Sequence, residues 1–267
     1  MFKLIALDMD GTLLKNDKTI SYQNLNAIKN AIAKGIHVVL CTGRPLNGIK
    51  KYIDELNFSK GTHYVICLNG ALVQDTRDSI ICSLTLNSND YNKIYNLSKD
   101  LNVNIQVVST NVNFTPNKNI NKHTIRHCYH NNMELKVIDS CNIPENTVIS
   151  KIMFVDDKDL LDEVIPKLPS WLYDNYTVVR SSENYLEILN KEASKGNAVR
   201  LLADHLKISK DHVICVGDAE NDISMIKYAG LGIAMNNAFD EVKASADLIV
   251  SSNEDHGVAE VFERFLL

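Results

Sequence analysis

Two aspartates, Asp8 and Asp10, follow a short apolar run near the start of the chain, in the stretch Asp8-Met9-Asp10-Gly11-Thr12. One carboxylate of such a pair can attack phosphorus as a nucleophile, while the other transfers the proton of the leaving group. Attack by a carboxylate gives an acyl phosphate, which water can later hydrolyse. A solvated turn is the alternative. However, the pattern Asp-x-Asp-Gly-Thr, with four specified positions, arises by chance in under about 1% of chains of this length. The spacing therefore favours phosphoryl-transfer chemistry.

A second polar group, Thr42-Gly43-Arg44, comes directly after the apolar run Ile36–Cys41. The Thr42 hydroxyl can donate a hydrogen bond to a phosphate oxygen, and Arg44 can bind a charged substrate group through two parallel hydrogen bonds. Taken alone, the same residues also fit a strand-to-helix turn, with Thr42 as a helix cap and Arg44 on the surface.

A third group, Gly217-Asp218-Ala219-Glu220-Asn221-Asp222, follows the run Val213–Val216. Carboxylate oxygens suit Mg²⁺, which takes few protein carboxylates and keeps water and phosphate oxygens in its octahedron. We expect Asp218 to share Mg²⁺ with Asp8, and Asn221 and Asp222 to be direct or supporting oxygen donors. A helix N-terminus also attracts acidic residues, but such dense negative charge would repel itself without a cation.

Lys195, in Ala193-Ser194-Lys195-Gly196, stands at a predicted helix start. A lysine there can neutralise the charge that phosphoryl transfer places on the equatorial oxygens, or balance crowded carboxylates. By itself, a lone lysine is usually a solvated side chain.

The elements that must position these groups follow from short apolar runs that end in small or polar residues. Runs of this kind are typical of strands covered on both faces, as in a parallel sheet. They are Leu4–Leu7, Ile36–Cys41, Tyr64–Leu68, Val213–Val216, Leu231–Met235 and Leu248–Val250. Helical spacing lies between them at Ser21–Lys34, which Ser21 can cap and Gly35 can end, and at Leu46–Leu56. The alternation predicts a doubly wound α/β fold, in which reactive groups gather beyond the carboxyl ends of the strands.

The middle of the chain has a separate alternation of predicted helices and strands. This pattern predicts a second α/β layer that is inserted into the first. We expect a core of residues 1–83 and 190–267 and an inserted domain of residues 84–189. Helices are predicted near Asp90–Leu101 and Asp159–Leu168, and strands near Asn104–Val108, Ile149–Val155, Tyr176–Arg180 and Tyr185–Leu189. Asn69-Gly70 and Asp75–Asp78 are predicted to be turns that lead out of the core.

Composition limits the partners and the location of the protein. The net charge of −5 argues against nonspecific electrostatic binding to nucleic acid or to an anionic membrane. No apolar run approaches the roughly 18 residues that a membrane helix needs. The six cysteines show no Cys-x-x-Cys spacing, and a carboxylate at Asp8 interrupts the first apolar run too early for a signal peptide. We expect a cytoplasmic protein with reduced thiols.

Taken in order, the four groups resemble those of the haloacid dehalogenase superfamily, and most closely its Cof-type sugar-phosphate phosphatases. Their α/β cap is inserted between the second and third motifs, as the middle domain is here. The resemblance covers essentially the whole chain and extends to Ala234-Met235-Asn236-Asn237-Ala238 and Asp255-His256-Gly257-Val258-Ala259. It implies a Rossmann-like core and a Mg²⁺-dependent phosphatase that acts on a small, soluble phosphomonoester.

The resemblance also implies a role for each matching residue. Asp8 would form an aspartyl phosphate, and Asp10 would act as general acid and then as general base. Thr42 and Lys195 would hold the phosphoryl group. The implied metal ligands are the Asp8 carboxylate, the Asp10 backbone carbonyl and Asp218, supported by Asp222 and Asn221. The implied substrate-binding residues are Thr42, Gly43, Arg44, Asn69, Gly70, Lys195 and Asn237. Asn236 departs from the family pattern, which commonly has glycine there.

Three alternatives remain at the level of sequence. A phosphomutase would return the phosphoryl group to a sugar, and a catalytically inactive module would only bind a sugar phosphate. A signalling receiver domain also phosphorylates an aspartate, but its acceptor lies in the middle of a chain half this length. Sugar phosphates are the preferred substrate class, and nucleotides, flavin mononucleotide and pyridoxal phosphate are the alternatives. The oligomeric state cannot be read from the residues.

Three histidines, His123, His127 and His130, surround Cys128 in the predicted cap. His123 and His127 would share one face of a helix, which would allow a zinc site. A polar cap surface, or contact with substrate, is the alternative.

Overall fold

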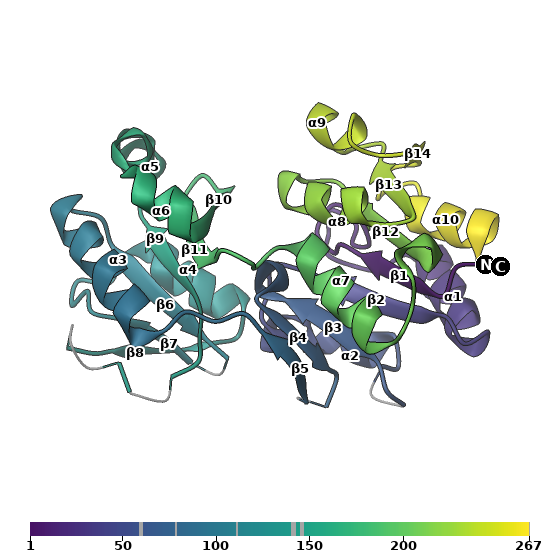
Figure 1. Cartoon of the computed structure of the whole chain (residues 1–267), viewed down its shortest axis with the longest axis horizontal. Coiled ribbons are helices and arrows are strands. Elements are labelled where there is room, and N and C mark those ends of the chain that lie inside the picture. Colours follow the sequence, from purple (N-terminus) through teal and green to yellow (C-terminus); the bar gives the residue numbers. More distant parts are fainter. Residues whose placement is uncertain (59–60, 78, 111, 140–142, 145–146, 267) are drawn as a thin grey trace. The chain divides into compact units, whose positions relative to one another are not determined.

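The computed structural model describes residues 1–58, 61–77, 79–110, 112–139, 143–144 and 147–266. The chain divides into two compact units (Figure 1). The first consists of Met1–Gly43, Lys50–Cys82 and Ser194–Leu267, and the second of Arg44–Ile49 and Ser83–Ala193.

The first unit is built on a sheet with strand order β14-β13-β12-β1-β2-β3-β4-β5 within the described residues. Its strands are β1 (Leu4–Leu7), β2 (His37–Cys41), β3 (Tyr64–Cys67), β4 (Leu72–Asp75), β5 (Ile80–Ser83), β12 (Val213–Gly217), β13 (Leu231–Met235) and β14 (Leu248–Val250). The six strands predicted from apolar runs are confirmed, and they pair in parallel from β14 to β3. The predicted α/β fold class is therefore correct.

The sheet is not parallel throughout, because β4 pairs with β3 in the antiparallel sense. The connecting 3₁₀ turn, Leu68–Gly70, places three successive residues at positive φ, with values of 55°, 56° and 93°. We predicted that Asn69-Gly70 leads the chain out of the core, but this turn reverses the chain and adds β4 to the sheet beside β3. A tight reversal can join only antiparallel strands, since a parallel pair needs a long crossover.

Helices cover both faces of this sheet (Figure 1). On one face α7 (Lys195–His205) and α8 (Ile223–Tyr228) pack against the apolar side chains of the central strands. On the other face α1 (Tyr22–Ala33) packs against α10 (Gly257–Phe265). The predicted cap of α1 is confirmed, because the Ser21 side chain accepts a hydrogen bond from the Asn24 backbone N–H.

The remaining predicted helix, Leu46–Leu56, has two parts. Leu46–Ile49 forms a 3₁₀ turn that belongs to the second unit, and α2 (Lys50–Glu55) belongs to the first. A short helix, α9 (Asp240–Lys243), follows β13.

The second unit has a sheet with strand order β10-β11-β9-β6-β7-β8 in the described part of the chain. Its strands are β6 (Ile105–Ser109), β7 (Val112–Thr115), β8 (Glu134–Val137), β9 (Ile149–Val155), β10 (Tyr176–Ser182) and β11 (Tyr185–Asn190). Its helices are α3 (Ser88–Asp100), α4 (Lys122–His130), α5 (Lys158–Val164) and α6 (Ser170–Asn175). The predicted strands and the helix at α3 are confirmed, and the predicted helix Asp159–Leu168 ends as a 3₁₀ turn after α5.

The two faces of the second sheet differ in chemistry. Residues from α3, α5 and α6, such as Ile94, Leu161 and Leu172, form an apolar core with one face. The opposite face carries the buried ion pair Lys151–Glu187, with 2.7 Å between Nζ and Oε1.

The cysteines and the helices can be compared with the sequence analysis. The cysteines that the structure describes, Cys41, Cys67, Cys82, Cys128 and Cys215, carry free thiols, while Cys141 lies outside the described residues. Among the described helices, none combines the length and the apolar character that a membrane crossing requires.

Candidate active site

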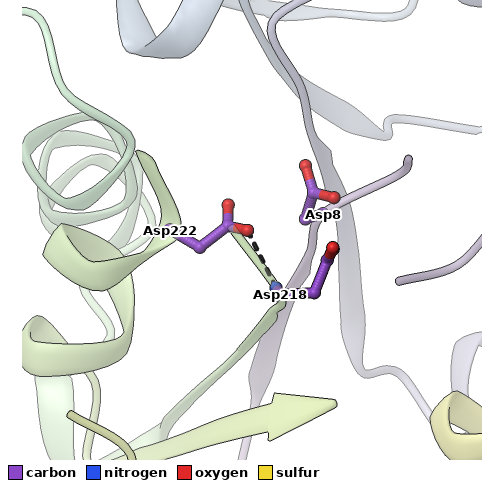
Figure 2. A group of neighbouring side chains, drawn as sticks. All are labelled: Asp8, Asp218 and Asp222. Carbon is purple, nitrogen blue, oxygen red and sulfur yellow. Dashed lines mark hydrogen bonds between the residues drawn. The ribbon is translucent and has the colours of Figure 1, made fainter. Parts of the chain in front are cut away.

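The carboxylates of Asp8, Asp218 and Asp222 meet at the carboxyl ends of β1 and β12 (Figure 2). Oxygen atoms from the three side chains lie within 4.8 Å of one another. The sheet explains why residues about 210 positions apart are neighbours, since β1 and β12 pair in parallel with Leu7 opposite Val216. The Asp8 backbone N–H extends this pairing to the Val216 carbonyl, at 3.0 Å.

Lys195 lies inside this cluster rather than on the surface. Its Nζ donates to Asp8 Oδ1 at 2.5 Å and to Asp222 Oδ1 at 2.6 Å, and the residue is 1% exposed. Its place follows from local structure, because Lys195 is the first residue of α7 and the Ser194 hydroxyl caps that helix through the Asn197 N–H. The alternative of a solvated lysine is therefore wrong.

The cluster carries more negative than positive charge. Burial, reinforced by Asp222 and Asp218, raises the pKa of Asp8 well above its ordinary value, although Lys195 opposes the shift. Burial also raises the pKa of Asp218 to about 6. Burial alone would lower the pKa of Lys195, but the carboxylates of Asp222 and Asp8 raise it, so this side chain stays charged. Three carboxylates beside one ammonium leave an excess that a divalent cation would offset.

The donor set fits a hard cation such as Mg²⁺, because the side chains gathered here offer carboxylate oxygen. Asp8 and Asp218 are the better candidates for direct ligands. Both oxygens of Asp222 already have partners: Oδ1 accepts from Lys195, and Oδ2 accepts from the backbone N–H groups of Asp218 and Ala219 at 3.0 Å each (Figure 2). Asp222 therefore orients Lys195 and the loop that carries Asp218.

Two further residues shape this part of the site: Thr12, which received no role from the sequence, and Gly11, where the sequence predicts a sharp backbone turn. The Thr12 hydroxyl, which is fully buried, donates to Asp218 Oδ1 at 2.7 Å. Gly11 has a φ of 90°, and a Cβ at this position would overlap the Asp218 carboxylate. Both lie in the motif that begins at Asp8, but only the fold brings them to Asp218.

A second group of predicted residues joins the end of β2 to the turn after β3. The Asn69 N–H donates to the Thr42 carbonyl at 3.1 Å, and Asn69 Oδ1 accepts from Asn221 Nδ2 at 2.9 Å. Gly43 packs against the same asparagine, because a Cβ on Gly43 would lie 3.1 Å from Asn69 Oδ1. Asn69 thus connects this turn to the Asp218 loop, and the substrate contacts of Thr42, Gly43 and Asn69 stay predictions.

Gly70 has a φ of 93° and lies against the backbone at the start of α7, where a Cβ would overlap the Ser194 carbonyl. This close approach holds the turn after β3 against the residue that precedes Lys195. A contact between Gly70 and substrate stays a prediction.

Asp10, Asn237 and Arg44 lie outside the carboxylate cluster. Asp10 Oδ1 forms an ion pair with Lys18 Nζ at 2.8 Å. Asn237 supports the loop after β1, because its Nδ2 donates to the Gly11 carbonyl at 2.8 Å and its Oδ1 accepts from the Asn253 N–H at 3.0 Å. Arg44 begins the segment Arg44–Ile49 of the second unit. Substrate contacts by Asn237 and Arg44 stay predictions.

The histidines of α4 do not form a zinc site with the residues that the structure describes. His123 Nε2 pairs with Asp157 Oδ1 at 2.8 Å, and His127 Nδ1 lies 3.0 Å from Gln106 Nε2. Within the described residues, Asp8, Asp218 and Asp222 form the group of three or more possible metal ligands that lie close enough to share an ion.

Residues 5–262 match the family described as haloacid dehalogenase-like hydrolase. The chain belongs to this family. A relative in Bacillus subtilis (strain 168), named "Putative phosphatase YxeH", is 41% identical over 268 residues, which cover 100% of this chain and 99% of the relative. A second relative there, 5-amino-6-(5-phospho-D-ribitylamino)uracil phosphatase YcsE, is 30% identical over 99% of this chain and 96% of its own length.

The fold of this haloacid dehalogenase-like hydrolase is shared with solved structures. One from Bacteroides thetaiotaomicron, itself described as a haloacid dehalogenase-like hydrolase, aligns with a TM-score of 0.87 and 29% identity over 99% of both chains. The predicted superfamily and the predicted enzyme class, a hydrolase of phosphoric monoesters, are confirmed by these relatives.

Proposed function

We propose that this hydrolase is a Mg²⁺-dependent phosphatase that forms an aspartyl phosphate on Asp8 and acts on small phosphorylated metabolites. One observation carries the proposal. The Asp8 carboxylate, at the end of β1, contacts a buried lysine and lies within 4.8 Å of Asp218 and Asp222. This arrangement holds an anionic nucleophile where a cation and an ammonium can offset the charge of an incoming phosphate.

The chain's own side chains account for the two chemical steps. In the first step, a bond forms between an Asp8 oxygen and phosphorus, the ester P–O bond breaks, and the leaving oxygen takes a proton from Asp10. In the second, water gives a proton to Asp10 and attacks phosphorus, and the bond from Asp8 to phosphorus breaks. Lys195 stays protonated and holds Asp8 through both steps. Mg²⁺, held by Asp8, the Asp10 carbonyl and Asp218, would supply positive charge that favours the ionised nucleophile.

We assign the catalytic core to residues 1–83 and 190–267 and the cap to residues 84–189. The proposed substrates are sugar phosphates and related phosphorylated polyols, bound by Thr42, Arg44, Asn69 and Asn237. The relative YcsE supports this class, because the compound in its name carries a 5-phospho-D-ribityl group. We also propose that the enzyme acts in the cytoplasm, in keeping with its free thiols.

A phosphate-release screen over a panel of sugar phosphates, nucleotides, flavin mononucleotide and pyridoxal phosphate tests this proposal. We expect free phosphate with Mg²⁺, near-complete loss with a chelator, and recovery when Mg²⁺ is restored. Free phosphate also distinguishes a phosphatase from a phosphomutase, which would return an isomeric sugar phosphate instead. Activity that is unchanged by chelation would contradict the metal requirement.

A further inference from the structure

A tight hairpin follows the loop that carries the proposed catalytic aspartates. The Lys15 N–H donates to the Thr19 carbonyl at 3.0 Å, and the Lys18 N–H donates to the Lys15 carbonyl at 2.9 Å. Asp17 Oδ1 accepts from the Thr19 N–H and hydroxyl at 3.0 and 2.6 Å. These bonds fix the backbone of the hairpin.

The backbone of Lys18 is fixed in an uncommon conformation. Its φ of 64° lies in the left-handed region, which a residue with a side chain adopts only when its surroundings impose it. The hydroxyl of Tyr52 donates to the Lys18 carbonyl at 3.0 Å, and Tyr52 is 1% exposed. A buried side chain of α2 therefore holds the hairpin where it presents Lys18.

The side chain of Lys18 reaches back to Asp10. Its Nζ lies 2.8 Å from Asp10 Oδ1, while the two side chains are 51% and 39% exposed. An ion pair this open to water contributes little to folding stability. Its effect is on orientation, because the held backbone keeps the Lys18 ammonium within reach of Asp10, and the hydrogen bond favours one rotamer of the short Asp10 side chain.

We propose that Lys18 is a positioning residue, which holds the Asp10 carboxyl where it gives a proton to the leaving oxygen and takes one from the attacking water. The inference rests on the proposed function and adds a residue to it. Proton transfer needs the carboxyl within hydrogen-bond reach of the leaving oxygen, and a small misplacement costs rate without weakening substrate binding. Loss of Lys18 should therefore lower kcat and leave KM nearly unchanged.

The variant Lys18→Met tests this with two substrates that differ in their need for a proton. An alkyl ester, such as the best sugar phosphate of the screen, must protonate its leaving oxygen. The nitrophenolate of p-nitrophenyl phosphate leaves without a proton. We expect kcat/KM to fall about tenfold for the sugar phosphate and less than about twofold for the aryl ester. Lys18→Arg, which keeps a cationic donor, should restore most of the lost rate.

Lys15→Met is the matched control, because it removes the same charge from the same hairpin. Lys15 Nζ lies 3.6 Å from Glu254 and 4.0 Å from Asp17. Both substrates should keep their wild-type kcat/KM in this variant. In an Asp10→Asn background, Lys18→Met should cause no further loss, since a residue that acts through Asp10 has no effect without it.

Equal losses on the two substrates would overturn the inference, because they would indicate a structural role. A rise in KM with kcat unchanged would also overturn it and would assign Lys18 to substrate binding. Absence of phosphate release by the wild-type enzyme would instead refute the proposed function, and the inference with it. An active wild type with an unaffected Lys18→Met variant would refute the inference alone.

Discussion

Lys195 shows how burial gives a single side chain its role. A lone lysine is the least specific of the sequence signals, yet here it is buried between Asp8 and Asp222 and bonded to both. A buried charge without a partner would be expensive, so each member of this cluster depends on the others. The sequence predicted that Asp8 and Asp218 lie close together and that Lys195 could balance crowded carboxylates, and the structure brings these side chains together. The hydrogen bond from Thr12 could not be predicted, because Thr12 meets Asp218 only through the pairing of β1 with β12.

Thr12→Val should weaken Mg²⁺ activation. The substitution keeps the shape of this buried side chain but removes the hydroxyl that donates to Asp218 Oδ1. We expect the Mg²⁺ concentration for half-maximal activity to rise about tenfold, with kcat at saturating Mg²⁺ nearly retained. Thr12→Ser keeps the hydroxyl and should behave like the wild type. An unchanged Mg²⁺ requirement in Thr12→Val would show that this hydrogen bond does not support the metal.

Asp218→Asn should stabilise the metal-free protein at neutral pH. The pKa of Asp218 rises from 3.8 to about 6 on folding, so the folded state binds more protons than the unfolded state between these pH values. Stability from this group is therefore lost as the pH rises through that window. In chelator at pH 7.5 we expect the variant to be about 1–3 kcal/mol more stable by urea unfolding, with no difference near pH 3.5. A less stable variant at pH 7.5 would contradict this.

The elements that hold the site differ in how well their sequences predict them. The parallel strands are continuous apolar runs, and α1 carries both its capping serine and its terminal glycine. In contrast, β8 is short and largely exposed, and the buried face of α4 is mostly polar, so neither carries an apolar pattern that marks it in the sequence. The antiparallel β4 could not be predicted, because the turn before it depends on a close approach to α7.

Gly70→Ala should destabilise the protein more than Gly35→Ala. Both glycines have positive φ, at 93° and 81°, so a methyl group costs about 1 kcal/mol at either position through backbone strain. At Gly35 nothing lies within 4 Å of the added Cβ, whereas at Gly70 it would overlap the Ser194 backbone. We expect a total loss of about 2–4 kcal/mol for Gly70→Ala in urea unfolding. Equal losses in the two variants would show that the turn can move away from α7.

At the scale of the whole molecule, the carboxylate cluster of the first unit and His127 of the second unit respond to acid in opposite ways. In the carboxylate cluster of the first unit, protonation of Asp8 and Asp218 removes the repulsion between their negative charges, so this cluster becomes more stable in acid. In the second unit, burial and then Lys151 lower the pKa of His127 from 6.5 to about 3. This histidine is neutral when folded and charged when unfolded, so its contribution is lost as the pH falls from about 6.5 to 3. Composition cannot reveal this contrast, since it depends on which titratable groups the fold buries.

Hydrogen exchange should therefore detect acid-induced opening of the second unit first. In the metal-free enzyme, we expect amides of β6, β9 and α4 to lose protection between pH 6.5 and 4.5, while those of β1 and β12 keep theirs. His127→Gln removes the titrating ring and should reduce the loss in the second unit. Earlier loss of protection in β1 and β12 would contradict the assignment of acid sensitivity to the second unit.

The central claim, that Asp8 becomes covalently phosphorylated, is tested most directly by trapping the intermediate. Enzyme mixed with its best substrate and Mg²⁺ is quenched in acid within milliseconds and treated with borohydride, which reduces an aspartyl phosphate to homoserine. Mass spectrometry of the peptides then locates the change. The account predicts homoserine at position 8 in the wild type and none in Asp8→Asn, which should also release no phosphate. Homoserine at another aspartate, or wild-type turnover by Asp8→Asn, would contradict it.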